Sequence, residues 1–468
     1  MLDTLIKGGS VVTEQQVRNL DVAIRDGKVA ALIEPGSLDV EAKSVIDATG
    51  LYVLPGGIDA HVHFDLAISE VMRAQSAEAG ARAAAYGGTT TYIDFAFQRG
   101  TQIGLTQAIE EKIQQTRAQP VSIDFALHAI LSGDFPLGLT GEIKEAVSGG
   151  VVSFKMFTTF RGSQTIGGLY TDDGRIYSVM SEAVKHSAGV MVHCEDDCII
   201  DYNVRRLYAE GRQQFWNIAE ARPALAEEAA ANRMILLSRR TGCPLYVVHV
   251  SAKDTLERIR EAREKGLLVS GEVLHPQLLF TPEDYRKPQG QRYMNYPANK
   301  SDADRKALWD GCLDGSLQTM ASDDYTIPLE NKLTGDTVDN CTGGTNSVET
   351  RMAVFWSEGV VKRNMDVRRF VTMTAANPAR LFGIYGKKGV IAPGADADIV
   401  IMNPNGNHTF RQGQNLHSDC DYSNWDGWET TGFPVVTMLR GMVLVDHGKW
   451  VGPEGLGQFV AGGVPELC

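Results

Sequence analysis

Short apolar runs alternate with amphipathic segments through the middle of the chain. Eight of these runs have the length of buried strands, and most of them are separated by segments with helical periodicity. In the clearest helical segment, residues 254–265, Leu256, Ile259 and Ala262 share one face and Gly266 ends the pattern. Strands that alternate with helices in this way predict a (β/α)8 barrel, and an open doubly wound sheet is the alternative fold. The predicted strands are 51–58, 89–95, 121–131, 151–156, 190–193, 245–249, 267–273 and 317–321, and two further helices are expected at 219–240 and 302–313.

Both ends of the chain have a different pattern, that of short strands joined by tight turns. Residues 21–33 alternate around Asp26-Gly27, which is a strong hairpin signal. The far end repeats the pattern, with strand-like residues on both sides of Asp446-His447-Gly448-Lys449. We therefore expect one small β-sandwich domain assembled from both termini, with the barrel inserted between its two halves. The expected boundaries are residues 1–54 and 384–468 for the β-sandwich domain and 55–383 for the barrel.

The composition is that of a globular protein, and the net charge argues against some classes of binding partner. Of the 468 residues, 43% are hydrophobic and 22% are charged, and the net charge is −13. Nucleic acids and anionic membranes attract basic surfaces, so we expect neither as a partner. The absence of a signal-peptide pattern and of a run of about 20 apolar residues favours a cytoplasmic protein. The seven scattered cysteines fit free thiols in a reducing compartment.

Residue types that bind metals follow the predicted strands at their carboxyl ends. His61 and His63 come after the first strand, and two residues apart on an extended segment they point to the same side. In a barrel, the carboxyl ends of the strands converge on one mouth, where the active site lies. Imidazoles and a carboxylate suit zinc or a similar divalent ion, so the sequence predicts a metal centre there. The other candidates are Lys155, His193 and His249, which end the fourth, fifth and sixth strands, and Asp323, which follows the eighth.

Lys155 is an unusual member of such a group, because a protonated amine does not bind a cation and its ordinary pKa is about 10.4. Two interpretations are open. The lysine pairs with a nearby carboxylate, or its neutral amine adds carbon dioxide to become a carbamate. A carbamate is an anionic group that can bridge two ions, which lie about 3.5–4 Å apart in two-metal sites.

The segments that carry these candidates resemble the cyclic amidohydrolases, the group of dihydropyrimidinases, hydantoinases and allantoinases. The resemblance spans nearly the whole chain, and the segments come in the family's order. It implies a two-zinc barrel with a small β-sandwich, a carboxylated Lys155 that bridges both ions, and a homo-oligomer, either a dimer or a tetramer. It also implies that His61, His63 and Asp323 complete one metal site, while His193 and His249 complete the other. The segments are Gly57-Ile58-Asp59-Ala60-His61-Val62-His63-Phe64, Gly87-Gly88-Thr89-Thr90, Ser153-Phe154-Lys155-Met156-Phe157, Val192-His193-Cys194-Glu195, Val248-His249-Val250-Ser251, Ala321-Ser322-Asp323, Asn377-Pro378-Ala379-Arg380-Leu381-Phe382-Gly383 and Gly394-Ala395-Asp396-Ala397-Asp398.

The same resemblance implies a hydrolase that opens a small cyclic amide or imide. A hydroxide held between two cations is a nucleophile at neutral pH and would attack the ring carbonyl. Asp323 is expected to accept the hydroxide proton and pass it to the leaving ring nitrogen, and a role as a metal ligand alone is the alternative. Some relatives act as non-catalytic scaffolds after losing metal ligands, whereas this chain keeps all the candidate positions.

The position that would stabilise the substrate oxyanion departs from the family pattern. Five residues after Lys155 the family usually has a tyrosine that donates a hydrogen bond to the oxyanion, and Phe160 stands there in this chain. Phenylalanine has no hydroxyl and cannot donate. Thr158, Thr159 and Arg161 are the alternative donors nearby.

A second substrate-binding segment is also altered. The family's Cys-Ser-Pro-Pro-like segment reads Met294-Asn295-Tyr296-Pro297 here, so Asn295 and Tyr296 are candidates for binding the ring, and Tyr296 is a further source of a hydroxyl. Asn346 is another candidate, and Asp324 stands where the family usually has a histidine. We therefore predict a hydantoinase- or dihydropyrimidinase-like hydrolase with an altered pocket. A lactam, an allantoin-like ureide or a heteroaromatic ring is the alternative substrate.

Overall fold

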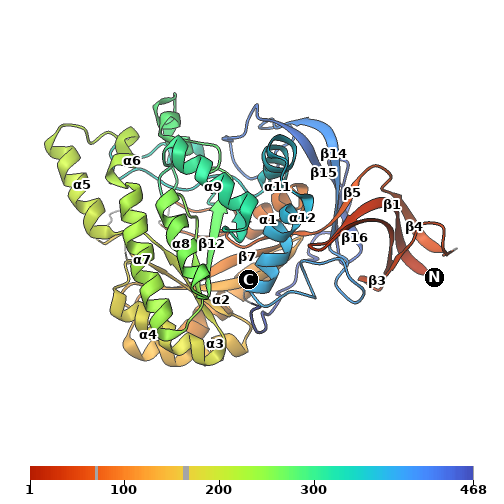
Figure 1. The fold of residues 1–468 in the computed structure, drawn as a ribbon, viewed down its shortest axis with the longest axis horizontal. Helices are drawn as coiled ribbons and strands as arrows, with labels where there is room; N and C mark the ends of the chain where they lie inside the picture. Colours follow the sequence, from red (N-terminus) through yellow and green to blue (C-terminus); the bar gives the residue numbers. More distant parts are fainter. Residues whose placement is uncertain (39, 69–71, 162–167, 467–468) are drawn as a thin grey trace.

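The computed structural model of the protein describes residues 1–38, 40–68, 72–161 and 168–466, so the last two residues of the expected β-sandwich segment 384–468 lie outside it. Eight parallel strands form one sheet in which each strand neighbours the next one along the chain (Figure 1). The segments after the first and last of these strands meet through a bridge between Val62 and Asp324, where the His63 N–H donates to the Asp324 carbonyl at 2.9 Å. The sheet therefore curls into the predicted barrel, and the doubly wound alternative is wrong. The strands are β6 (Gly57–Asp59), β7 (Thr89–Gln98), β8 (Asp124–Leu131), β9 (Ser153–Phe157), β10 (Gly189–His193), β11 (Leu245–Val247), β12 (Val269–Leu274) and β13 (Thr319–Ala321).

The first predicted strand, 51–58, is in fact two strands that belong to different sheets. Strand β5 (Tyr52–Pro55) pairs with strands from both chain ends, and only β6 enters the barrel. The chain passes from one sheet to the other at Gly56, where a Cβ atom would lie 2.1 Å from Oγ1 of Thr90. An apolar run alone does not reveal such a crossing, because both halves of it are buried.

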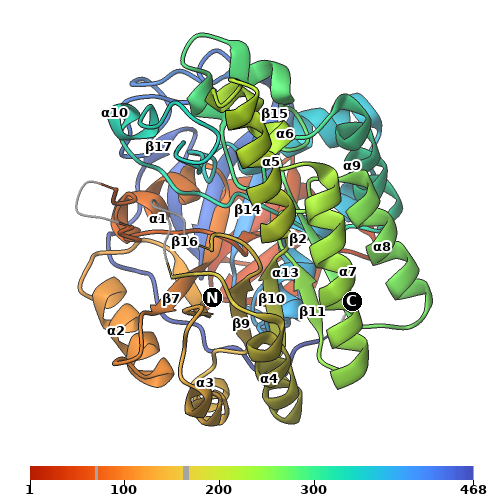
Figure 2. The ribbon, with the colours of Figure 1, turned by 90° about the vertical axis from the view of Figure 1, so that its left-hand side faces the viewer.

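Helices surround the barrel strands, as Figure 2 shows from the side opposite the second sheet. The prediction for 254–265 is confirmed by α8 (Lys253–Glu264), which buries Leu256, Ile259 and Ala262. The helix predicted over 219–240 is interrupted at Pro223, which cannot continue a hydrogen-bonded helix, and α7 (Ala224–Thr241) begins after it. None of the helices in the described part of the chain has the length and apolarity needed to cross a bilayer. The other main helices are α1 (Ala77–Tyr86), α2 (Leu105–Arg117), α3 (Ile143–Ser148), α4 (Asp173–Ala183), α5 (Asp197–Ala209), α6 (Ile218–Ala221), α9 (Asp302–Asp314), α11 (Arg351–Phe355), α12 (Val367–Val371) and α13 (Asn377–Leu381).

The second sheet joins strands from the two segments that flank the barrel in the chain, and these strands lie on the right of Figure 1. Strand β5 sits between β1 and β14, so it connects the amino-terminal strands to the carboxyl-terminal ones. The predicted hairpin at Asp26-Gly27 is confirmed, because both residues have positive φ angles of 53° and 74°. The strands are β1 (Leu2–Val12), β2 (Val17–Arg25), β3 (Lys28–Ile33), β4 (Ala42–Asp47), β5 (Tyr52–Pro55), β14 (Ile399–Thr409), β15 (Glu429–Leu439), β16 (Met442–Asp446) and β17 (Lys449–Trp450).

A buried cluster of charges ties this sheet to the amino end of the barrel. Lys388 is 1% exposed and makes ion pairs with Asp124 at the start of β8 and with Asp396 and Asp398 just before β14, the last two at 3.0 and 2.7 Å. Arg440, in the turn between β15 and β16, adds a second cation beside Asp124. The three carboxylates are thus neutralised by protein cations, and their grouping does not require a metal ion.

The residues after β17 run across the amino end of the barrel. Phe125 pairs with this segment through two backbone hydrogen bonds, to Gln458 at 2.9 Å and from Val460 at 2.7 Å. Gly462 then donates to the Gly150 carbonyl at 2.9 Å, just before β9. The chain itself therefore covers part of the amino end of the barrel.

Candidate active site and metal centre

A cavity of about 400 Å³ opens at the carboxyl ends of the barrel strands. Its wall brings together residues that are far apart in the sequence, as the convergence of parallel strands requires. The predicted metal residues in the wall are His61, His63, Lys155, His193, His249 and Asp323. Three of the predicted substrate residues, Phe160, Asn295 and Tyr296, lie in the same wall.

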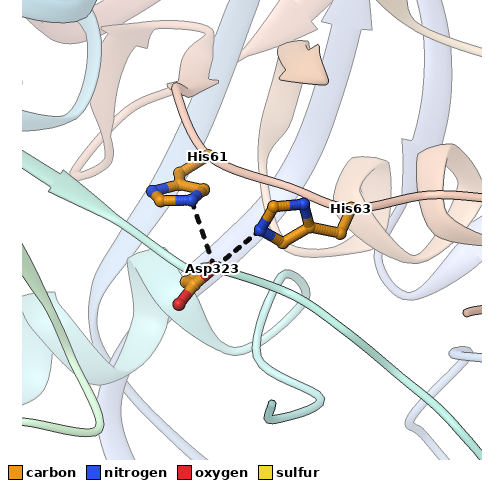
Figure 3. A group of neighbouring side chains, drawn as sticks. All are labelled: His61, His63 and Asp323. Atoms are coloured by element: carbon orange, nitrogen blue, oxygen red, sulfur yellow. Dashed lines mark hydrogen bonds and ion pairs between the residues drawn. The ribbon is translucent and has the colours of Figure 1, made fainter. Parts of the chain in front are cut away.

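Asp323 lies between the two histidines that follow β6 (Figure 3). Its Oδ1 atom is 3.0 Å from Nε2 of His63 and 3.2 Å from Nε2 of His61. One ligand atom from each of the three side chains lies within 4.8 Å of the other two. Burial lowers the pKa of His63, which favours the neutral imidazole that binds metal ions.

A buried glutamate fixes the orientation of His61. Oε1 of Glu272, on β12, is 2.8 Å from Nδ1 of His61 and accepts the backbone N–H of His249 at 3.0 Å. Oε2 accepts the hydroxyl of Tyr246 at 2.9 Å. Because Nδ1 of His61 is held by the carboxylate, Nε2 is the nitrogen available to an ion in the cavity.

The Asp59 carboxylate also fixes the backbone of the two segments that carry His61 and Asp323. Asp59, at the end of β6, accepts the N–H of His61 at 3.3 Å and of Ser322 at 3.1 Å, and Arg351 lies 3.3 Å from its other oxygen. This carboxylate joins the end of β6 to the end of β13. Asp323, next to Ser322, has a φ of 50°, a conformation that a residue with a side chain adopts only when its surroundings hold it there.

Lys155 and the other two histidines form the second half of the cluster. Lys155 is 1% exposed, and burial lowers its pKa to about 8. The rings of His193 and His249 meet edge to face at 4.5 Å, and the His249 ring lies 5.6 Å from that of His61. Burial lowers the pKa of both His193 and His249, so both favour the neutral form.

His193 is oriented by a charged pair beneath the cavity. Its Nε2 lies 2.7 Å from Glu195, which also accepts a hydrogen bond from Arg222 at 2.6 Å. Burial alone would raise the pKa of Glu195, but the Arg222 charge and the His193 hydrogen bond outweigh it and lower the pKa to about 2. Glu195 is therefore ionised at neutral pH and fixes the imidazole, as outer carboxylates do in metal sites.

The side chains around the cavity fit divalent metal ions. Neutral imidazoles and one carboxylate are the donors that zinc prefers. The Nδ1 atom of His249 is buried without a hydrogen-bond partner among the described residues, which leaves a donor available to an ion. His61 and His193 are each fixed through one ring nitrogen by a carboxylate, which is the usual outer support of a metal ligand.

The donors proposed to replace a hydroxyl at Phe160 are engaged elsewhere. Phe160 itself lines the cavity at a φ of 73°, which is rare for a bulky residue. The Thr158 hydroxyl lies 2.9 Å from the carbonyls of both His193 and Glu195, and the Thr159 hydroxyl lies 3.5 Å from Asp197. The Arg161 guanidinium stacks on Tyr170, 4.0 Å from the ring centre.

Asn295 and Tyr296 lie in the cavity wall in different ways. Asn295 is 4% exposed and donates to Oδ2 of Asp323 at 3.2 Å. Tyr296 presents its ring, while its hydroxyl donates to the Cys341 carbonyl at 2.7 Å. The Tyr296 hydroxyl is thus already engaged by the backbone of the Cys341 loop.

Two further positions singled out in the sequence anchor loops near the cavity. Asn346 donates through its side chain to the Tyr422 carbonyl at 2.5 Å, and it is not among the residues that line the cavity. Asp324 accepts the backbone N–H groups of Ser347 and Val348 at 2.7 and 3.0 Å, and burial raises its pKa to about 6. Asp324 therefore holds the loop that carries Asn346.

The supporting residues Asp59, Glu195, Arg222 and Glu272 were not singled out in the sequence. Glu272 leaves a signal, since it is the one charged residue of a strand that is buried along its whole length. A buried charge is costly unless it is paired, so such a residue points to a polar partner. The partner itself, His61, lies 211 positions away and cannot be deduced from local pattern.

Comparisons with known proteins show the family of the chain. Residues 52–444 match the Amidohydrolase family. The chain belongs to the amidohydrolase family. It is 34% identical to a D-hydantoinase of Streptomyces coelicolor over 97% of each chain, and 35% identical to a D-hydantoinase of Geobacillus stearothermophilus over 97% of this chain and 96% of that protein.

A solved structure extends the similarity to the whole fold. The crystal structure of the dihydropyrimidinase from Brevibacillus agri NCHU1002 superposes with a TM-score of 0.91 at 33% identity and covers 100% of both chains. This amidohydrolase therefore shares the overall fold of that protein.

Proposed function

We propose that this amidohydrolase is a metal-dependent hydrolase that opens the ring of a cyclic amide or imide, as a hydantoinase or dihydropyrimidinase does. The observation that carries the proposal is the convergence of four histidines, Lys155 and Asp323 on one cavity at the barrel mouth. Its relatives are D-hydantoinases over nearly their whole length, which supports this ring class over a lactam or a heteroaromatic ring. The scaffold alternative is not supported, because no candidate position has been lost.

Two divalent ions, most suitably zinc, would be held by the six cavity residues. His61, His63 and Asp323 would serve one ion and His193 and His249 the other, with Lys155 between them. When bound, such a pair of ions lowers the pKa of a water molecule and polarises a carbonyl.

Lys155 is suited to carboxylation. Its amine is buried, and at a pKa of about 8 a substantial fraction is neutral near physiological pH. The neutral nitrogen attacks the carbon of CO2, a C–N bond forms, and the nitrogen releases one proton to solvent. The product is an anionic carbamate, which compensates the positive charge of the ions.

Asp323 is the residue of the chain that would move the proton. Its Oδ1 faces the two imidazoles and its Oδ2 faces Asn295. We assign to this carboxylate the acceptance of the proton from the attacking water and its delivery to the ring nitrogen as the C–N bond breaks. The reaction then consumes one water, adds one hydrogen to the ring nitrogen and leaves an open-chain carboxylic acid, which releases its proton to solvent as a carboxylate.

The altered part of the pocket is an aromatic wall formed by Phe160 and Tyr296. Their rings meet edge to face at 5.3 Å, and the Arg222 guanidinium lies behind them, 5.0 and 4.5 Å from their centres. Further apolar side chains in the cavity wall include Leu66, Ile68 and Phe97. We therefore propose substrates with a bulky apolar substituent on the ring, because plain rings would leave this apolar surface unfilled.

A substrate panel tests the function. Protein purified with zinc and bicarbonate would be assayed against hydantoin, 5-substituted hydantoins of both hands, dihydrouracil, allantoin and a lactam. We expect opening of hydantoins, fastest for bulky apolar 5-substituents, and about two zinc ions per chain. No ring opening across the panel by zinc-loaded protein would overturn the proposal. Equal rates on plain and substituted hydantoins would refute the altered pocket alone.

We further propose that the protein is a cytoplasmic homo-oligomer. Tyr202 on α5 and Leu225 on α7 are 65% and 58% exposed, so part of this helical face is apolar. A subunit contact would bury such side chains. Light scattering measures the mass directly, and a mass of one 51.0 kDa chain would refute the proposal.

A further inference from the structure

Two loops at the mouth of the barrel are joined by several side chains. One loop carries Asn295 and Tyr296, and the other runs from Cys341 to Gly344. Lys332 is buried and donates to the carbonyls of Met294 and Thr342, one in each loop, at 2.6 and 2.8 Å. These bonds leave the two loops little freedom to move separately.

The Tyr296 side chain adds two further contacts between the two loops. It packs on Gly343 so closely that a Cβ atom at that position would lie 2.3 Å from the ring. Its hydroxyl reaches the Cys341 carbonyl at 2.7 Å. Asn295, immediately before Tyr296, is therefore held on a rigid support rather than on a free loop.

The amide orientation of Asn295 is determined by its neighbours. Its Oδ1 accepts the backbone N–H groups of Tyr296 at 2.9 Å and Gly344 at 3.2 Å. An NH2 group in that place would face two donors, so the oxygen must occupy it. Nδ2 is then left to face Oδ2 of Asp323 at 3.2 Å.

The two oxygens of Asp323 thus have separate environments. Oδ1 lies beside the imidazoles of His61 and His63, and Oδ2 accepts only the Asn295 amide among the described residues. A carboxylate oxygen has about two acceptor sites, so Asn295 fills one site on Oδ2 and leaves the other.

We propose that Asn295 is a positioning residue that holds the Asp323 carboxylate so that Oδ2 keeps one free lone pair for the transferred proton. This inference rests on the proposed ring-opening reaction, in which Asp323 carries the proton. In this role Asn295 exchanges no proton, and it acts through Asp323.

Two variants separate this role from folding. Asn295→Asp keeps the acceptor for Tyr296 and Gly344 but replaces the donor with a carboxylate that repels Asp323, whereas Asn295→Ala loses both the acceptor and the donor. We expect kcat to fall about 10- to 100-fold in each, which matches the loss of one hydrogen bond to a charged group. KM should change less than about threefold, zinc content should not change, and the solvent deuterium isotope effect on kcat should increase because proton transfer becomes slower.

Asn299→Ala is the matched control. Asn299 is an equally buried asparagine four residues further on, and its side chain donates to the Tyr293 carbonyl at 3.3 Å. It should lower the thermal midpoint without changing kcat. An equal loss of kcat in this control, a rise in KM alone, or a loss of zinc in the Asn295 variants would each overturn the proposal.

A readout without turnover tests the contact itself. In protein labelled with 15N-asparagine, the side-chain amide signal that disappears in Asn295→Asp should shift in Asp323→Asn. An unchanged signal would overturn the inference. If the wild-type protein opens no ring, the proposed function fails, and the amide signal still decides whether Asn295 holds Asp323.

Discussion

The carboxylate of Glu272 lies 2.8 Å from Nδ1 of His61. The contact joins a strand in the second half of the barrel to the first pair of candidate ligands, and it decides which nitrogen of His61 faces the cavity. Outer partners of this kind typically contribute 10- to 100-fold to metal affinity.

Replacing Glu272 with glutamine should therefore weaken zinc binding by about 10- to 100-fold, because the imidazole loses its charged partner. Competition with a chelator of known affinity measures the change. Glu358→Gln is a suitable control, since Glu358 is a buried glutamate that pairs with Lys362 and Arg363 on a helix. Unchanged zinc affinity in Glu272→Gln would contradict the assigned role.

Replacing Lys155 with alanine should abolish turnover, because the proposed anionic bridge would be lost while the other candidate ligands remain. Short carboxylic acids such as acetate or propionate should restore part of the activity by supplying a carboxylate in the same space. The measurement is the initial rate with and without the added acid. High activity in the variant without any added acid would argue against the carbamate.

Replacing Phe160 with tyrosine should raise kcat on plain hydantoin by about tenfold or more, because a hydroxyl at this position could donate to the oxyanion. Phe157→Tyr is the control, since Phe157 lines the same cavity from the end of β9. A rate for Phe160→Tyr no higher than that of the wild type would mean that another donor already serves the oxyanion.

Replacing Lys388 with methionine should destabilise the protein by about 3–5 kcal/mol, because three buried carboxylates would lose their shared cation. Burial by itself would lower the pKa of Lys388, but the charges of Asp398 and Asp124 outweigh it and hold the pKa above its ordinary value of about 10.5. The folded protein therefore keeps this proton at pH values at which the unfolded chain has lost it.

The contribution of Lys388 to the free energy of unfolding is thus complete below about pH 10.5 and is lost as the pH rises through the higher folded pKa. Urea unfolding of both proteins at pH 8 and in steps above pH 10.5 tests this. The difference between wild type and Lys388→Met should be largest at pH 8 and should shrink in the alkaline range. A difference that grows with pH would contradict the sign of the linkage.

The barrel could be predicted from the sequence because its strands and helices follow local hydrophobic patterns, and these patterns match the elements of the structure. The sequence also placed His61, Lys155 and Asp323 at strand ends, and parallel strands bring such ends together. The point at which the chain passes from one sheet to the other could not be predicted, because the crossing at Gly56 depends on the close approach of Thr90. The roles of the side chains in the cavity wall could not be predicted from the sequence either. The Tyr296 hydroxyl could only be located once the Cys341 loop was in place.

The position of β5 between β1 and β14 has a consequence for synthesis of the chain. The two partners of β5 are separated by most of the polypeptide, because β14 follows it by about 350 residues. At about 5–20 residues synthesised per second, β5 would emerge from the ribosome roughly 20 to 70 seconds before β14. During that interval one edge of the amino-terminal sheet is unpaired, and an unpaired edge is where a nascent chain is most exposed to aggregation.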